Sequence, residues 1–249
     1  SLGWLFAANL VGVLLAAFLL WPELNTLLQP LTYGRWIPLH LDWQLYGWCF
    51  IPLLGFICMH FFDHQKRGAQ AIAWCIGLWS LGLLAGGYTW LDGGATGKVF
   101  LNWNTTSGFI FTTAQLIIWS LLAIAWFERL RSRDTLQESV ISLSVKAIAL
   151  LGLIAVPAVL LITSDPAVYP PINPESGGAT GHSLLLSTLS LVFLMGLLPR
   201  WILKKETENS KRLKRASLYF WSFYAFSTVV FLLIEHGNAS NRTFNQVFG

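Results

Sequence analysis

Long apolar stretches, separated by short polar connections, run along the whole chain. Each stretch reaches the length of about 20 residues that an α-helix needs to cross the hydrocarbon core of a bilayer. None of them alternates polar and apolar residues with a period of two, as a membrane β-strand would. The pattern predicts an all-α, polytopic membrane helix bundle of about seven transmembrane helices, which forms a single domain over residues 1–249. The predicted spans are 2–21, 36–62, 69–91, 105–127, 142–163, 183–203 and 216–235.

The composition supports a membrane protein and excludes an ordinary soluble domain. Of the 249 residues, 55% are hydrophobic and 11% are charged, whereas about a quarter of the residues of a soluble domain are charged. The formal net charge is +4, but the basic residues lie in the connections between spans. We therefore expect the lipid bilayer, and no nucleic acid, among the partners of the chain.

The distribution of basic residues predicts the orientation. The connections after the second, fourth and sixth spans hold 12 of the 16 Lys and Arg residues. Cytoplasmic loops are enriched in these residues, so we predict that the N-terminus and these three connections face the cytoplasm. Lys146 lies near the inner end of the fifth span, where it either extends to the membrane surface or belongs to a proton route.

The five histidines fall at the ends of predicted helices. With this orientation, His40, His182 and His236 all lie at the outer side of the membrane. His60 and His64 lie at the inner end of the second helix, and for them we favour interfacial anchoring or pairing with a neighbouring acid over metal binding. Ionisable residues within membrane spans are functional candidates by default, so the three outer histidines define the candidate site.

His40 shares one helical face with Gln44, Gly47 and several aromatic residues. An imidazole followed by a polar residue and a glycine suits a flat macrocycle, because the glycine would let the ring approach the backbone and the imidazole would ligate its iron. The same pattern is also typical of a histidine that caps backbone groups at the interface, beside an ordinary belt of aromatic residues. Spacing alone favours the second interpretation.

A resemblance to a known family favours the first interpretation, in which His40 ligates the iron of a macrocycle. The stretch "GRWIPLH", residues 34–40, is similar to the G-R-x-x-P-x-H segment of the central subunit of heme–copper oxidases, closest to the cbb-type and nitric-oxide-reductase branches. The resemblance continues in "GGATGHSLLLSTLSLVFLMGLLPR", similar to the sixth helix of the family, and "LYFWSFYAFSTVVFLLIEHG" stands where the seventh should be. It implies that His40 is an axial ligand of a low-spin heme b.

The chain departs from the family at the copper site. The family holds copper with one histidine of the sixth helix and an adjacent His–His pair of the seventh. This chain offers His182 and, at the end of the seventh predicted span, the single His236. Because Cu(II) favours several imidazoles, we expect His182 and His236 to be remnants of a copper site and not a complete one.

The chain also departs from the family in length. The family core has about twelve helices, and the tenth supplies the second axial ligand of the low-spin heme. We therefore expect this sequence to be part of a longer oxidase-like chain. Otherwise the second ligand has to come from another subunit, from His182 or from His236, or be absent.

Two functions follow as alternatives. The resemblance implies a heme-b-containing respiratory electron-transfer subunit of the bacterial inner membrane, with other subunits of a respiratory complex and a c-type cytochrome as partners. Arg35 would then pair with a heme propionate, or else be an ordinary interfacial arginine. The resemblance also allows cytochrome c oxidase activity, but the missing histidine pair argues against dioxygen reduction. The alternative is a non-redox scaffold subunit that kept the oxidase-like fold.

Overall fold

The computed structural model describes residues 1–63, 65–95, 100, 102–103, 105–132 and 139–164, together with isolated helical positions between 211 and 226. Every regular element in these residues is a helix, which confirms the all-α prediction for this part of the chain. The elements are α1 (Leu2–Leu20), α2 (Leu24–Leu27), α3 (Tyr33–Asp42), the π-helical segment η1 (Trp43–Cys49), α4 (Phe50–Phe62), α5 (Gly68–Thr89), the π-helical segment η2 (Trp90–Gly94), α6 (Thr105–Arg131) and α8 (Val140–Ser164).

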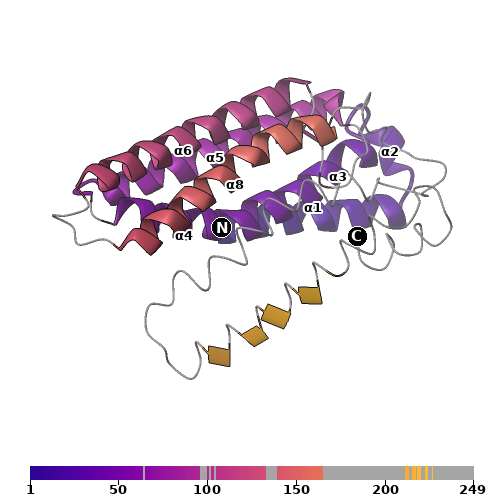
Figure 1. The fold of residues 1–249 in the computed structure, drawn as a ribbon. Coiled ribbons are helices and arrows are strands. Elements are labelled where there is room, and N and C mark those ends of the chain that lie inside the picture. The colour runs from indigo at the N-terminus through magenta and orange to yellow at the C-terminus, as the bar shows by residue number, and fades with distance from the viewer. Residues whose placement is uncertain are drawn as a thin grey trace.

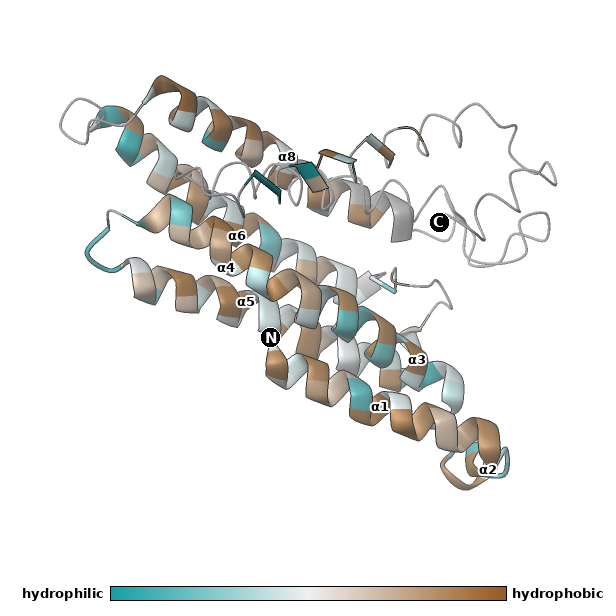
Figure 2. Ribbon diagram, turned by 90° about the horizontal axis from the view of Figure 1, so that it is seen from below, coloured by the Kyte–Doolittle hydropathy of each residue, from teal (hydrophilic) through white to brown (hydrophobic). Residues whose placement is uncertain are grey.

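Five helices are long and apolar enough to cross a membrane, and they match the first five predicted spans. The second of them, Tyr33–Phe62, is one continuous rod made of α3, η1 and α4, and η2 extends α5 in the same way. Figure 1 shows the five spans side by side in one bundle, and in Figure 2 apolar colour runs along most of their lengths. The predicted spans 183–203 and 216–235 lie outside the described residues, apart from isolated positions, so the count of seven remains a prediction.

Glycines on α5 allow its close approach to α6. Helices in lipid gain little from hydrophobic burial against each other and associate where small residues let them pack closely. A Cβ added at Gly82 would lie 2.6 Å from Cδ2 of Phe111, and one added at Gly86 would lie 2.8 Å from Cζ3 of Trp103. The two glycines, four residues apart on one face, therefore accept aromatic rings that a larger residue would exclude.

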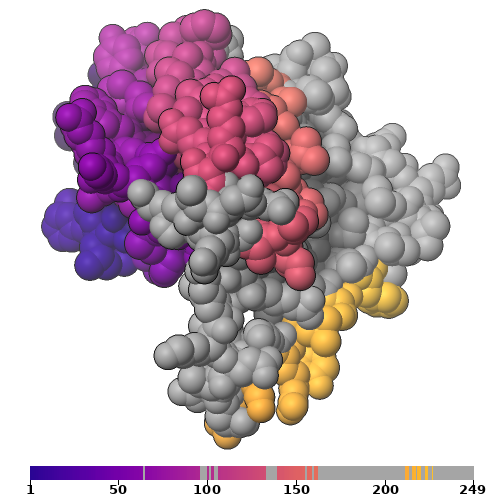
Figure 3. Space-filling view, turned by 60° about the vertical axis from the view of Figure 1, so that its left-hand side comes forward, coloured from indigo at the N-terminus to yellow at the C-terminus, as the bar shows by residue number. Residues whose placement is uncertain are grey.

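Two indole groups fix the register between α6 and the antiparallel α8. Trp119 Nε1 donates to the carbonyl of Leu150 at 2.8 Å, and Trp126 Nε1 donates to that of Leu143 at 3.0 Å. Donors and acceptors are each seven residues apart, so the two bonds repeat after two helical turns. Figure 3 shows the side chains of α8 directly beside those of α6.

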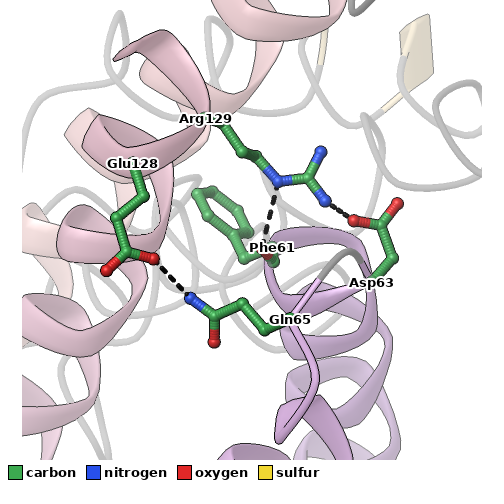
Figure 4. A network of polar contacts seen from close by, with 5 residues as sticks. All are labelled: Phe61, Asp63, Gln65, Glu128 and Arg129. Carbon is green, nitrogen blue, oxygen red and sulfur yellow. Dashed lines mark hydrogen bonds and ion pairs between the residues drawn. The ribbon is translucent and has the colours of Figure 1, made fainter. Parts of the chain in front are cut away.

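A polar network closes the end of the bundle that we predict to be cytoplasmic (Figure 4). Arg129, only 4% exposed, pairs with Asp63 and donates from Nε to the carbonyl of Phe61 at 3.2 Å. Gln65 Nε2 donates to Glu128 Oε2 at 2.8 Å. These contacts tie the α4–α5 connection to the end of α6. They give Asp63 an arginine partner.

The glycine contacts generate a test of the packing. We expect Gly82→Leu to lower the free energy of unfolding by about 1–3 kcal/mol, the usual cost of forcing extra atoms into a packed interface. Gly77→Leu on the same helix is the matched control, because nothing lies within 4 Å of a Cβ added there. Thermal unfolding in detergent measures both variants, and equal losses of stability would contradict the proposed α5–α6 contact.

Candidate cofactor site on the second span

The bundle holds the His40 ring against α1. The start of α3 is held by the side chain of Asn25, whose Oδ1 accepts the N–H of Tyr33 at 2.9 Å. Two turns later, His40 Nδ1 lies 2.8 Å from the carbonyl oxygen of Ala8 on α1. A carbonyl oxygen only accepts hydrogen bonds, so Nδ1 carries the hydrogen. In a neutral imidazole Nε2 then keeps its lone pair, and no described residue hydrogen-bonds to it.

A glycine on α1 makes room for this ring. Gly12 lies one turn after Ala8, and a Cβ added there would lie 2.7 Å from Cε1 and 2.9 Å from Nδ1 of His40. Real Cβ atoms do not approach other heavy atoms that closely, so any other residue at this position would displace the imidazole. The position of the ring therefore depends on α1 as much as on α3.

The remaining residues of the predicted macrocycle-facing stripe also contact α1. Gln44 Nε2 donates to Asn9 Oδ1 at 3.2 Å, and a Cβ added at Gly47 would lie 2.8 Å from Cβ of Trp4. The glycine thus allows a helix to approach, where the sequence suggested a flat ligand. Periodicity correctly grouped these residues on one face, but it could not say what covers that face.

The Arg35 side chain bonds to the main chain at the end of the third span. Its Nη1 donates to the carbonyl of Leu91 at 2.6 Å, beside Gly93, whose φ of +109° ends the helix. A cation at the carboxyl end of a helix is favourable, because the unpaired carbonyls there carry partial negative charge. A guanidinium has five N–H donors, so this bond leaves donors for a second acceptor such as a carboxylate.

A buried polar cluster, which the sequence analysis did not single out, lies around Asp42. The Asp42 side chain is fully buried, and Asn102 Nδ2 donates to its Oδ2 at 3.3 Å. Its Oδ1 has no hydrogen-bond partner among the described residues. Tyr46 OH donates to the carbonyl of Phe100 at 2.9 Å, and Trp90 Nε1 donates to that of Asn102 at 2.7 Å. The sequence feature that could have predicted this cluster is Asp42 itself, an acidic residue within an apolar helix, two positions after His40.

The other predicted site residues are not brought to His40 within the described residues. His60 lies 20 residues further along the same continuous rod, about 30 Å away at 1.5 Å per residue. His64, His182 and His236 lie outside the described residues. In the part of the chain that the structure describes, no three His, Cys, Asp or Glu side chains form a group that could hold a metal ion.

Comparison of the chain with protein-family models, with curated proteins and with solved structures finds no match in any of the three.

The contact between Gly12 and His40 predicts opposite changes in the free energy of unfolding for two glycine-to-alanine variants of α1. Gly12→Ala should lower the free energy of unfolding by about 1–3 kcal/mol, because the methyl group displaces the ring and breaks its bond to Ala8. Gly3→Ala on the same helix meets nothing within 4 Å and should be neutral or stabilising by up to about 1 kcal/mol, the gain in helix propensity. Chemical unfolding of the two variants measures the difference, and a stabilising Gly12→Ala would contradict the contact.

Proposed function

We propose that the chain is a heme-b-binding electron-transfer subunit of a respiratory complex in the bacterial inner membrane, with His40 as an axial ligand of the heme iron. The observation that carries the proposal is the bond from His40 Nδ1 to the Ala8 carbonyl. Histidines that ligate metals commonly donate their other ring N–H to a carbonyl or carboxylate, which fixes the ring orientation and raises the basicity of the ligating nitrogen. His40 has this arrangement, with Nε2 left for the iron.

The residues around His40 fit such a group in part. The imidazole is half-buried and its tautomer is set by Ala8, which suits an axial ligand. Arg35 keeps donors that could bind a propionate carboxylate. Gln44 and Gly47 contact α1, so we assign them to the α1–η1 contact and not to the face of the macrocycle.

Each residue then has a defined part in electron transfer. The heme, when bound, supplies reversible one-electron oxidation and reduction of its iron. His40 would hold the iron, and α1 would keep the imidazole from turning away through Ala8 and Gly12. A second axial ligand would come from outside the described residues, from His182, His236 or a partner subunit. Whether the complex also reduces dioxygen depends on residues that lie there.

A non-redox scaffold subunit is the second candidate, and one observation favours it. Arg35, Gln44 and Gly47 all find their partners inside the protein, at Leu91 and on α1. A helix bundle that only has to hold other subunits in the membrane would use its polar side chains in this way.

The reduced-minus-oxidised visible spectrum of the purified protein separates the two functions. We expect a b-type band in the native protein, its loss in His40→Ala, and its retention in His60→Ala, which removes a histidine from the far end of the same rod. Added imidazole should restore the band in His40→Ala if that variant keeps its fold, because it replaces the missing ligand.

Either of two results would overturn the heme proposal. One is a folded native protein with no b-type band, which would leave the scaffold function. The other is a b-type band that His40→Ala leaves unchanged, which would place the heme on other residues.

A further inference from the structure

A small cavity lies between α4, α5, α6 and α8. Its volume is about 20 Å³. Most of its wall is apolar, with Phe50, Leu54 and Ile118 among the lining residues, and Gln115 brings an amide into it. A polar side chain in an otherwise apolar cavity deep in a membrane protein requires an explanation, because no lipid headgroup or bulk water is at hand to bind it.

The amide of Gln115 has no hydrogen-bond partner within the described protein. The residue is 6% exposed, and both Oε1 and Nε2 are buried and unbonded. The two indoles that line the cavity cannot serve it, because each donates elsewhere: Trp79 to the carbonyl of Tyr46 and Trp119 to that of Leu150, both at 2.8 Å. A buried amide left in this state costs free energy, so a partner in the cavity is expected.

A proline in α8 supplies a second polar group at the same level. Pro157 stands inside the helix and has no N–H to donate to the carbonyl of Leu153, four residues earlier. Leu153 lines the cavity. Trp119 bonds to Leu150 across the α6–α8 interface. Gln115 comes one turn before Trp119, and Leu153 comes one turn after Leu150, so this antiparallel register brings the amide and the carbonyl to the same height.

We propose that this cavity binds a water molecule that bridges the amide of Gln115 and the carbonyl of Leu153. The water would accept a hydrogen bond from Nε2 and donate one to the carbonyl oxygen. An internal site holds a water when it offers roughly 10–15 Å³ and at least two polar partners. The cavity has the volume, and the unbonded Gln115 amide is the first partner. The second that we infer is the Leu153 carbonyl, which Pro157 leaves without its helical donor. The proposal is independent of the heme, because none of its groups contacts His40.

The site also gives Pro157 and Gln115 a joint structural role. A proline inside a helix opens the hydrogen-bond ladder, and an inserted water is one of the recognised causes of a bend at such a position. The bridging water would keep the opened turn of α8 attached to α6, one turn beyond the last indole bond. The ladder formed by Trp126 and Trp119 would thus continue through a water in place of a third indole.

A high-resolution map of the full chain tests the proposal, read together with two variants. In the native protein we expect an isolated peak at about 2.7–3.2 Å from both Gln115 and the carbonyl oxygen of Leu153. Gln115→Leu should abolish the peak and lower the melting temperature, because it removes the amide that holds the bridge to the Leu153 carbonyl. Pro157→Ala should weaken the peak, because the restored N–H competes with the water for the Leu153 carbonyl.

Gln115→Ala is the matched control, since it removes the amide but enlarges the cavity, and it should lower the melting temperature. The proposal is overturned if the native map shows the cavity empty and the Gln115 amide bonded directly to main chain. It is also overturned if the peak persists unchanged in Gln115→Leu, because the water would then not be held by the amide.

Discussion

Every polar group inside the hydrocarbon layer has to find its partner within the protein, because lipid offers none. In this bundle the main solution is a ring N–H that donates to a main-chain carbonyl of a neighbouring segment. In two cases, those of Trp43 and His40, the helix that carries the carbonyl has a glycine one turn later. Trp43 Nε1 donates to Leu83 at 3.1 Å, and Gly87, four residues later, opens the space for its ring. Further indoles make such bonds, at Trp36, Trp79, Trp90, Trp119 and Trp126.

His40 repeats this construction with an imidazole. Its Nδ1 bonds to Ala8, and Gly12, four residues later, opens the space. An indole uses its only nitrogen in such a bond and can do nothing more. An imidazole has a second nitrogen, so the same cross-link that holds two helices together would also orient the nitrogen that we propose as the heme ligand. The structural and functional interpretations of His40, which the sequence left as alternatives, are therefore compatible in one side chain.

The parts of the fold that could be predicted are those set by local composition. Length and apolarity located the first five spans, because crossing a bilayer demands both. Periodicity grouped His40, Gln44 and Gly47 correctly, yet which surface covers them depends on α1, and no local pattern encodes that contact. The proposed water site could not be predicted at all, because it needs the register between α6 and α8, which two indole bonds set.

The protonation of the His40 ring is the most direct test of this account. Nitrogen-15 spectra of histidine-labelled protein, recorded under reducing conditions and compared with those of His40→Gln, isolate the signals of this side chain. The account predicts a hydrogen on Nδ1 and none on Nε2. A hydrogen on Nε2 with a bare Nδ1 would contradict it, because the ring could then neither donate to Ala8 nor present the nitrogen that we assign to the iron.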